Sequence, residues 1–283
     1  MPELPEVETV RRDLEKVSLH QAIASVEILL DRTIAAPSPQ EFRDRLANRK
    51  LDGWNRRGKY LLGKLDDGSW LGVHLRMTGQ LFWLDTCEAP LEKHARVRFL
   101  MQNGAELRFI DQRTFGKLWW VAPGVEISDV ITGLATMGPE PLESEFTDAY
   151  FSQKLRKSTR PIKNALLDQR LVAGIGNIYA DEALFLSGIH PLQRCDRLSA
   201  QKIFKLRSSL VQVLQESLSQ RGTTFSSYRD LSGVNGNYLG QARVYSRKDE
   251  PCRQCEGTIE RIKLAGRSAH FCPSCQPLSA RKS

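Results

Sequence analysis

The chain has 283 residues, enough for two domains with their own hydrophobic cores. Lysine and arginine exceed aspartate and glutamate by 41 − 33 = 8, and the pI of about 9.3 favours a polyanionic partner. The sequence lacks a run of about 18 apolar residues, which excludes a membrane-spanning helix. It also lacks the apolar segment of a secretory signal at its start, so we expect a cytoplasmic protein.

The first residues, Met1-Pro2-Glu3, could supply a nucleophilic amine. Removal of Met1 would leave Pro2 with a free secondary amine. An α-amine titrates near pH 8, so part of it is unprotonated at neutral pH and can attack an aldehyde-like carbon to form an iminium. Glu3 lies beside it as a carboxylate able to move protons. On these residues alone, a trimmed N-terminus at a helix start is the simpler interpretation.

The residues that follow predict a helix and then a β-rich region. Apolar positions spaced by three and four predict a helix from about Pro5 to Leu19. Short apolar or alternating runs separated by turn residues then predict a β-sandwich or barrel; these runs are residues 23–30, 60–65, 70–74, 80–84, 96–100, 106–110 and 118–121. The segment MGPEP at residues 137–141 is typical of a linker.

After about Phe146 the pattern becomes helical. Ser199 is placed to cap a helix with one apolar face, which Gly222 ends. The Gly-, Asn- and Ser-rich stretch 222–240 is long for a connector, which favours a lid or a binding loop.

Four of the six cysteines form a zinc motif near the C-terminus. Two Cys-x2-Cys pairs supply four thiolates, the tetrahedral set that Zn²⁺ prefers; they are Cys252, Cys255, Cys272 and Cys275. Four protein ligands leave no open position, so one structural zinc is expected. Two disulfides are the alternative. Cys87 and Cys195 are left over as free, structural thiols.

Several polar and basic residues lie where strands or turns end. Lys59 precedes a predicted strand, and the HLRMTG and DQRTFG segments follow strands. Met, Arg and Phe side chains on such loops can form a wedge that enters a base stack, although core packing explains each one alone. A basic segment from 154 to 170 leads into the turn GIGN, whose Asn177 begins a predicted helix that could face a phosphate.

Together these motifs resemble one family, the bacterial formamidopyrimidine-DNA glycosylases of the Fpg/Nei group. The resemblance extends over essentially the whole chain, through PELPEVETV, RRGKYLL, HLRMTG, DQRTFG, GPEPL, GIGNIYADE, VYSRK and GRSAHFCPSCQ. It implies an α+β multidomain fold: an N-terminal β-sandwich with an N-terminal helix, a helical domain with a helix–two-turns–helix element, and a β-hairpin zinc finger. The expected divisions are 1–122, a linker 123–145, 146–241 with a lesion-capping loop 222–240, and 242–283.

The resemblance also implies an activity. The chain would remove oxidised purines such as 8-oxoguanine and formamidopyrimidines from duplex DNA, and its AP lyase activity would cut the strand by β,δ-elimination through a Schiff base. It would act in base-excision repair as a monomer. The implied catalytic residues are Pro2, Glu3, Lys59 and Arg267, and the implied DNA contacts are Met77, His94, Arg113, Phe115, Lys163, Asn177 and Tyr238.

Two positions depart from the family pattern. Thr114 stands where a second basic residue is common, which predicts slightly weaker and less salt-sensitive DNA binding. Ser158 and Thr159 also replace common basic residues, with Arg156 and Arg160 close by to compensate.

Three alternative functions remain open from the sequence. A sister Nei-type enzyme would prefer oxidised pyrimidines, although Leu4 and the Met77, Arg113 and Phe115 set favour the Fpg branch. A zinc-hairpin protein that binds damaged DNA without cutting it is the second. The third, a zinc-ribbon RNA or ribosome binder, does not explain Pro2 and Glu3.

Overall fold

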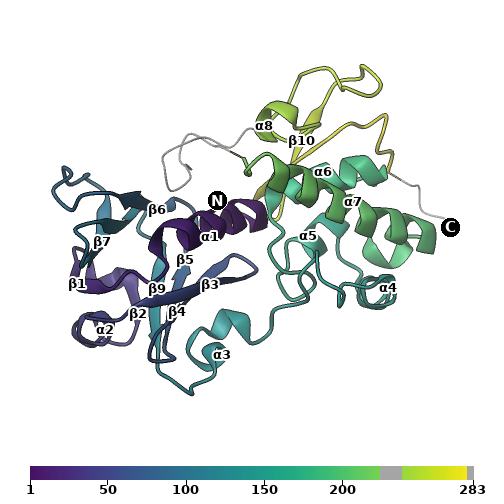
Figure 1. Ribbon diagram of the computed structural model, residues 1–283. Coiled ribbons are helices and arrows are strands. Elements are labelled where there is room, and N and C mark those ends of the chain that lie inside the picture. Colours follow the sequence, from purple (N-terminus) through teal and green to yellow (C-terminus); the bar gives the residue numbers. More distant parts are fainter. Residues whose placement is uncertain (224–237, 279–283) are drawn as a thin grey trace. The chain divides into compact units, whose positions relative to one another are not determined.

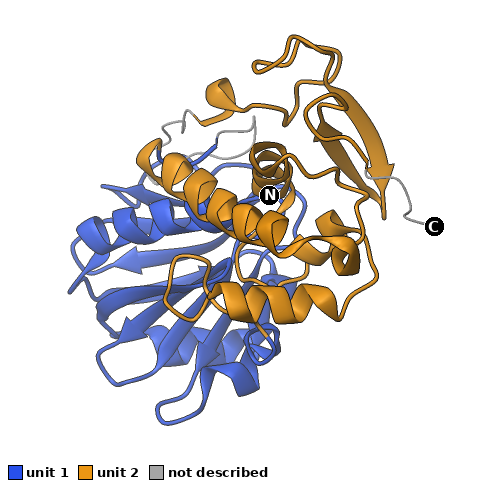
Figure 2. Ribbon diagram, turned by 90° about the vertical axis from the view of Figure 1, so that its right-hand side faces the viewer, with its two compact units in different colours: residues 1–136, 221–236 blue, residues 137–220, 237–283 orange. Residues whose placement is uncertain are grey.

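The computed structural model describes residues 1–223 and 238–278. The chain forms two compact units, one of residues 1–136 with 221–236 and the other of residues 137–220 with 237–283 (Figure 2). Most of the predicted loop 222–240 lies outside the described residues, and the domain boundaries expected above stay predictions. No helix within the described ranges is long and apolar enough to cross a membrane.

The first unit is a two-sheet β-sandwich that carries the N-terminal helix (Figure 1). One sheet is antiparallel, with the order β1-β7-β8-β6, and the other has the order β2-β9-β5-β4-β3 with a parallel β2–β9 pair. The elements are α1 (Leu4–Ser18), β1 (Ile23–Ile28), η1 (Asp31–Thr33), β2 (Ile34–Ala36), α2 (Pro39–Leu46), β3 (Leu51–Arg57), β4 (Tyr60–Leu65), β5 (Trp70–His74), β6 (Gly79–Leu84), β7 (Ala95–Met101), β8 (Glu106–Asp111), β9 (Lys117–Val121), α3 (Ile127–Val130) and η2 (Thr132–Leu134).

The hydrophobic core of this unit includes the alternately buried residues of β7. In β7 every second residue is buried, and Val97 and Phe99 enter the same core as Val7 and Leu14 of α1. An apolar face that is removed from water contributes roughly 25 cal/mol per Å². The predicted sandwich and its helix are therefore confirmed.

Helix α2 was not predicted from the sequence. It interrupts the β-rich region, and its start carries the usual signals: Pro39 is at the first position, and the Ser38 side chain accepts a hydrogen bond from the N–H of Glu41 at 3.2 Å. Only two of its residues, Phe42 and Leu46, are buried. That short apolar stripe explains why periodicity alone did not detect the helix.

The second unit contains the helical region and the zinc hairpin. Its elements are α4 (Asp148–Arg156), α5 (Ile162–Leu166), α6 (Asn177–Ser187), η3 (Cys195–Arg197), α7 (Ala200–Ser219), α8 (Tyr238–Gln241), β10 (Glu260–Leu264) and β11 (Arg267–Phe271). Ser199 caps α7 as predicted, accepting from the N–H of Lys202, although the helix ends at Ser219, before Gly222. Helix α6 packs against α7 and β11.

Two turns separate α5 from α6, as expected for a helix–two-turns–helix element. The side-chain amide of Gln169 fixes them: it accepts from the N–H of Gly174 at 2.9 Å and donates to the carbonyl of Ile175 at 2.8 Å. Gly174 has φ of +79°, a left-handed conformation that favours glycine. These contacts set the direction in which the chain enters α6 at Asn177.

Candidate active site and nucleic-acid interface

The N-terminal segment is buried against the sandwich. Glu3 is 2 % exposed, and its N–H donates to the Glu6 carboxylate at 2.8 Å. The other oxygen of Glu6 accepts from the N–H and the hydroxyl of Thr223 at 2.7 and 2.9 Å. Glu6 therefore joins the chain start to residue 223, more than two hundred positions later.

The terminal amine has a shifted pKa. Its pKa is lowered chiefly because burial disfavours the charged form, and the charges of Lys59 and Arg113 lower it further while Glu3 and Glu6 raise it. In the translated chain this amine belongs to Met1; after removal of Met1, the nitrogen of Pro2 becomes the terminus. The burial of Pro2 and Glu3 places that nitrogen in the same desolvated surroundings.

Lys59 lies in the β3–β4 turn and is only 6 % exposed. The preceding residue, Gly58, has φ of +54° and accepts from the Arg56 guanidinium at 3.0 Å, which fixes the turn. A buried lysine on a fixed turn is positioned more tightly than the solvated rim residue that its sequence context suggests.

His74 is a polar residue of this region that the sequence did not single out. It ends β5 opposite Tyr60, and the two rings meet edge to face with centroids 4.4 Å apart. Its Nδ1 accepts from the N–H of Arg76 at 2.9 Å, so the neutral ring carries its proton on Nε2. Burial, with the nearby charges of Arg76 and Lys59, lowers the pKa of His74 to about 3. Its place at a strand end, as the first residue of the HLRMTG segment, was the available signal.

The predicted wedge residues lie on two turns with their side chains outward. Met77 is 37 % exposed and Phe115 is 49 % exposed. The Arg113 guanidinium lies over the Phe115 ring, 4.9 Å from its centroid. His94 is half-buried before β7, with Nδ1 3.2 Å from Arg96 Nη2.

In the second unit, Asn177 is the first residue of α6, where backbone N–H groups lack helical partners. Its buried Oδ1 has no hydrogen-bond partner within residues 1–223 and 238–278. A side-chain amide in this state at a helix N-terminus is suited to an external ligand.

Lys163 and Tyr238 lie differently from what was expected of DNA contacts. Lys163 is 1 % exposed, and its ammonium donates to Asp181 at 2.6 Å and to the carbonyl of Ser268. Tyr238 is also 1 % exposed and packs on Tyr179, with ring centroids 5.6 Å apart. Burial raises the pKa of the Tyr238 phenol. A direct phosphate contact by Lys163 is not supported by this burial.

The four cysteines converge as a zinc ligand set. Their Sγ atoms all lie within 4.8 Å of one another, and none forms a disulfide. Four thiolates at such separations fit a tetrahedral Zn²⁺. Two residues with positive φ, Ala265 and Gly266, form the turn between β10 and β11, and the exposed Arg267 follows directly.

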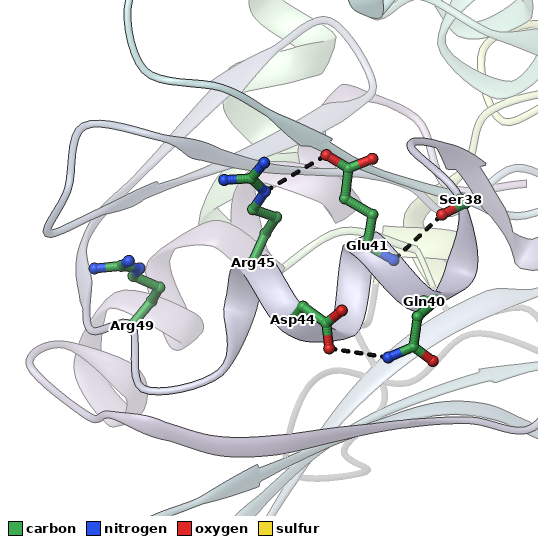
Figure 3. Close-up of a pocket in the computed structure, with 6 residues that line it drawn as sticks. All are labelled: Ser38, Gln40, Glu41, Asp44, Arg45 and Arg49. Carbon is green, nitrogen blue, oxygen red and sulfur yellow. Dashed lines mark hydrogen bonds and ion pairs between the residues drawn. The ribbon is translucent and has the colours of Figure 1, made fainter.

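A surface pocket of about 480 Å³ lies elsewhere, along α2 (Figure 3). Its charged groups already have partners: Glu41 faces Arg45 at 3.5 Å, and Arg49 pairs with Asp67 at 3.1 Å. None of the predicted site residues lines it, so it is not the candidate site.

Comparison with known proteins gives a consistent result over the whole chain. Family models match the formamidopyrimidine-DNA glycosylase N-terminal domain at residues 1–118, the H2TH domain of the same family at 137–229, and the zinc finger found in FPG and IleRS at 249–278. Formamidopyrimidine-DNA glycosylases of Synechococcus sp. and Synechococcus elongatus are 57 % and 55 % identical; the matches cover 99 % of this chain and 100 % and 99 % of theirs.

Solved structures agree with these matches. Lactococcus lactis Fpg in complex with DNA that contains an abasic site is 38 % identical, with a TM-score of 0.90 over 97 % of this chain and 99 % of that one. A mutant of the same protein bound to DNA that contains Fapy-dG is 37 % identical, with a TM-score of 0.89 over 98 % of this chain and 100 % of that one.

Proposed function

The chain belongs to the formamidopyrimidine-DNA glycosylase family and is a base-excision DNA glycosylase and AP lyase for oxidised purines, and we propose that it acts through a Schiff base on Pro2. The observation that carries this mechanism is the buried chain terminus beside Glu3 and within the field of Lys59, where the amine pKa is lowered. A lowered pKa at the chain start favours the unprotonated amine, the form that can act as a nucleophile.

In the proposed reaction, the Pro2 nitrogen forms a bond to sugar C1′ while the glycosidic bond breaks and its electron pair leaves with the base. Glu3 supplies the proton that opens the sugar ring, which leaves an iminium. The iminium makes the C2′ proton acidic, so its loss expels the 3′ phosphate and a further elimination expels the 5′ phosphate. Water then hydrolyses the remaining iminium and releases Pro2.

Each unit by itself offers fixed polar groups that would bind phosphates. Lys59 offers a charge, and His74 offers its Nε2–H as a neutral donor. Arg267 is exposed on the hairpin turn, and Asn177 lies at the start of α6. Such contacts supply affinity and register, whereas the pocket for the base selects the lesion.

Met77, Arg113 and Phe115 would fill the space that the everted nucleotide leaves, with Arg113 facing the orphaned cytosine. The exposure of Met77 and Phe115 on the two turns joined by Asp111 leaves both side chains accessible to DNA, which this role requires. We propose His94 as a backbone contact. Lys163 fits a positioning role better, and for Tyr238 a DNA contact would require its hydroxyl to leave its buried place.

The zinc is structural. Cys252, Cys255, Cys272 and Cys275 hold it, and it supplies no reactive position because four protein ligands fill its coordination. We propose that the enzyme acts in the bacterial cytosol at the nucleoid, because its substrate is chromosomal DNA.

Borohydride trapping tests the nucleophile. On a duplex with 8-oxoguanine opposite cytosine, reduction of the iminium should link the enzyme to DNA, and peptide mapping of the adduct should place the link at Pro2. Pro2→Gly keeps a primary amine that can still form an imine, so it should lower the yield of the adduct. Protein that mass spectrometry confirms to lack Met1 but that yields no adduct would exclude the Schiff base. A thymine-glycol duplex run in parallel tests the branch, since faster cutting of that substrate would contradict a preference for oxidised purines.

A further inference from the structure

Asp111, the last residue of β8, belongs to none of the groups assigned above, yet it contacts the three segments that carry Met77, His94 and the Arg113–Phe115 pair. It is 0 % exposed. Its Oδ1 accepts from the Thr78 hydroxyl and from the N–H of Arg113, the latter at 3.2 Å. Its Oδ2 accepts from the N–H of Gly116 at 2.7 Å.

The main chain of Asp111 adds the third turn. Its N–H donates to the carbonyl of His94 at 2.9 Å, and its own carbonyl accepts from Arg96 Nε at 2.9 Å. Opposite, β6 begins at Gly79, which pairs with Asp111 in the sheet register. One residue thus bonds to the segments that carry Met77, His94 and the Arg113–Phe115 pair.

The local backbone is shaped around this carboxylate. A Cβ added to Gly116 would lie 3.0 Å from Asp111 Oδ2 and 2.4 Å from the Phe109 ring, so only glycine fits there. The Thr78 hydroxyl also accepts from the N–H of Arg113 at 3.0 Å, which closes a ring of bonds among Asp111, Thr78 and Arg113. The two turns therefore cannot move independently without losing buried hydrogen bonds.

We propose that Asp111, with Thr78, is the positioning residue that locks the wedge turns of Met77 and of Arg113–Phe115 into one rigid unit, and so determines excision of a stacked base and discrimination of the opposite base. This inference rests on the proposed function. Asp111 touches no reacting atom; it acts through the turns. A wedge displaced by about 1 Å fills the gap poorly, and misplacement of that size can lower a rate by about 100-fold.

The proposal separates two activities of the same enzyme. Excision of 8-oxoguanine needs the base to leave the stack, whereas cleavage of a preformed abasic site needs the amine but has no base to evert. In Asp111→Asn, the side-chain NH2 group faces one of the backbone N–H groups of the turns, and that hydrogen bond is lost. We expect about 10- to 100-fold slower single-turnover excision and less than about threefold slower abasic-site cleavage.

A second readout concerns the opposite base. If Arg113 is held toward the orphaned base, the ratio of excision rates opposite cytosine and opposite adenine should fall toward one in Asp111→Asn. A merely structural residue would lower thermal stability and both activities together, and would leave this ratio unchanged. The matched control is Asp67→Asn, in a hairpin outside these turns, where the carboxylate accepts from the N–H and hydroxyl of Ser69 at 3.0 and 2.6 Å.

A conservative pair at Thr78 covers the case in which Asp111→Asn does not fold. Thr78→Val should reproduce the selective loss of excision, and Thr78→Ser should restore it because the hydroxyl returns. Unchanged excision and opposite-base ratio in Thr78→Val, or equal losses of both activities in a folded Asp111→Asn, would overturn the proposal. Failure of the wild-type protein to cut either substrate would instead contradict the proposed function itself.

Discussion

In the first unit, the groups proposed to face DNA lie on turns that follow strands, and the hydrogen bonds of Asp111 join these turns. In the second unit, they lie at the start of a helix and on a hairpin, and two consecutive acids of α6 bond to that hairpin and to the segment 243–245. Asp181 accepts from the N–H of His270 at 3.0 Å and from Lys163, and Glu182 accepts from three consecutive backbone N–H groups.

The difference lies in what each anchor supports. Asp111 bonds turns at the ends of the strands and is not among the residues of the hydrophobic core, so we expect its loss to change function more than stability. Asp181 and Glu182 are 0 % exposed and link separate segments of one unit, so their loss leaves buried N–H groups without partners. The first unit should tolerate loss of its anchor as a folded body, and the second should not.

The largest expected effect is removal of the zinc. Cys255→Ser, or chelation, should weaken binding to abasic-site DNA by about 100-fold or more, because the hairpin that presents Arg267 loses its cross-link. Fluorescence anisotropy measures the affinity, and elemental analysis measures the bound zinc. Cys195→Ser, at a buried thiol outside the cluster, should bind as the wild type does. Full affinity in a zinc-free Cys255→Ser protein would refute the structural role.

The next effect is on stability. Glu182→Gln should lower the free energy of unfolding by about 2–3 kcal/mol, because one amide N–H opposes a backbone N–H in a buried site. Urea unfolding measures the change. The control is Glu216→Gln: this acid also bonds Arg243, at 2.9 Å, but is partly exposed, so it should lose no more than about 1 kcal/mol. Equal losses in the two variants would remove the proposed contrast between the units.

The sequence predicts seven of the nine strands that the structure describes in the sandwich, because apolar or alternating runs such as that of β7 mark them. It does not predict β2, which has only three residues, or β3, in which polar residues interrupt the apolar positions. It predicts the zinc site because the two Cys-x2-Cys pairs are local. It does not predict the anchors. Asp111 and Thr78 are 33 positions apart, and Lys163 lies in a basic run that resembles a solvated helix face until its bond to Asp181 is seen. Burial of a charged group depends on partners that are distant in sequence.

A pH effect tests His74. Because the folded pKa of about 3 lies below the ordinary 6.5, the unfolded chain binds the proton first as the pH falls. The stabilisation is complete above pH 6.5 and is lost between 6.5 and 3. From about pH 7.5 to 5.5, the wild type should lose about 1.4 kcal/mol more unfolding free energy than His74→Asn. Urea unfolding measures both free energies over this pH range. If the unfolding free energies of the wild type and of His74→Asn changed with pH in the same way, His74 would not be held neutral.

The smallest effect concerns Thr114, for which the sequence predicts slightly weaker and less salt-sensitive DNA binding. The Thr114 hydroxyl accepts from Arg32 Nη2 at 2.6 Å, so a guanidinium from η1 lies beside the wedge turn although residue 114 is not basic. The main-chain carbonyl of Arg32 accepts from Lys117, which fixes η1 against the start of β9. We therefore expect Arg32 to replace the missing phosphate contact.

Each phosphate contact contributes about 0.9 to the slope of log K against log salt on duplex DNA. Arg32→Ala should lower the magnitude of this slope by about that amount, measured by anisotropy over a salt series. The matched variant is Arg45→Ala, an exposed arginine of the same unit that lies over the Trp120 ring, and it should leave the slope unchanged. If the slope is the same in Arg32→Ala as in the wild type, the phosphate contact that is missing at Thr114 has no replacement. The sandwich would then rely on fewer phosphate contacts than its wedge turns suggest.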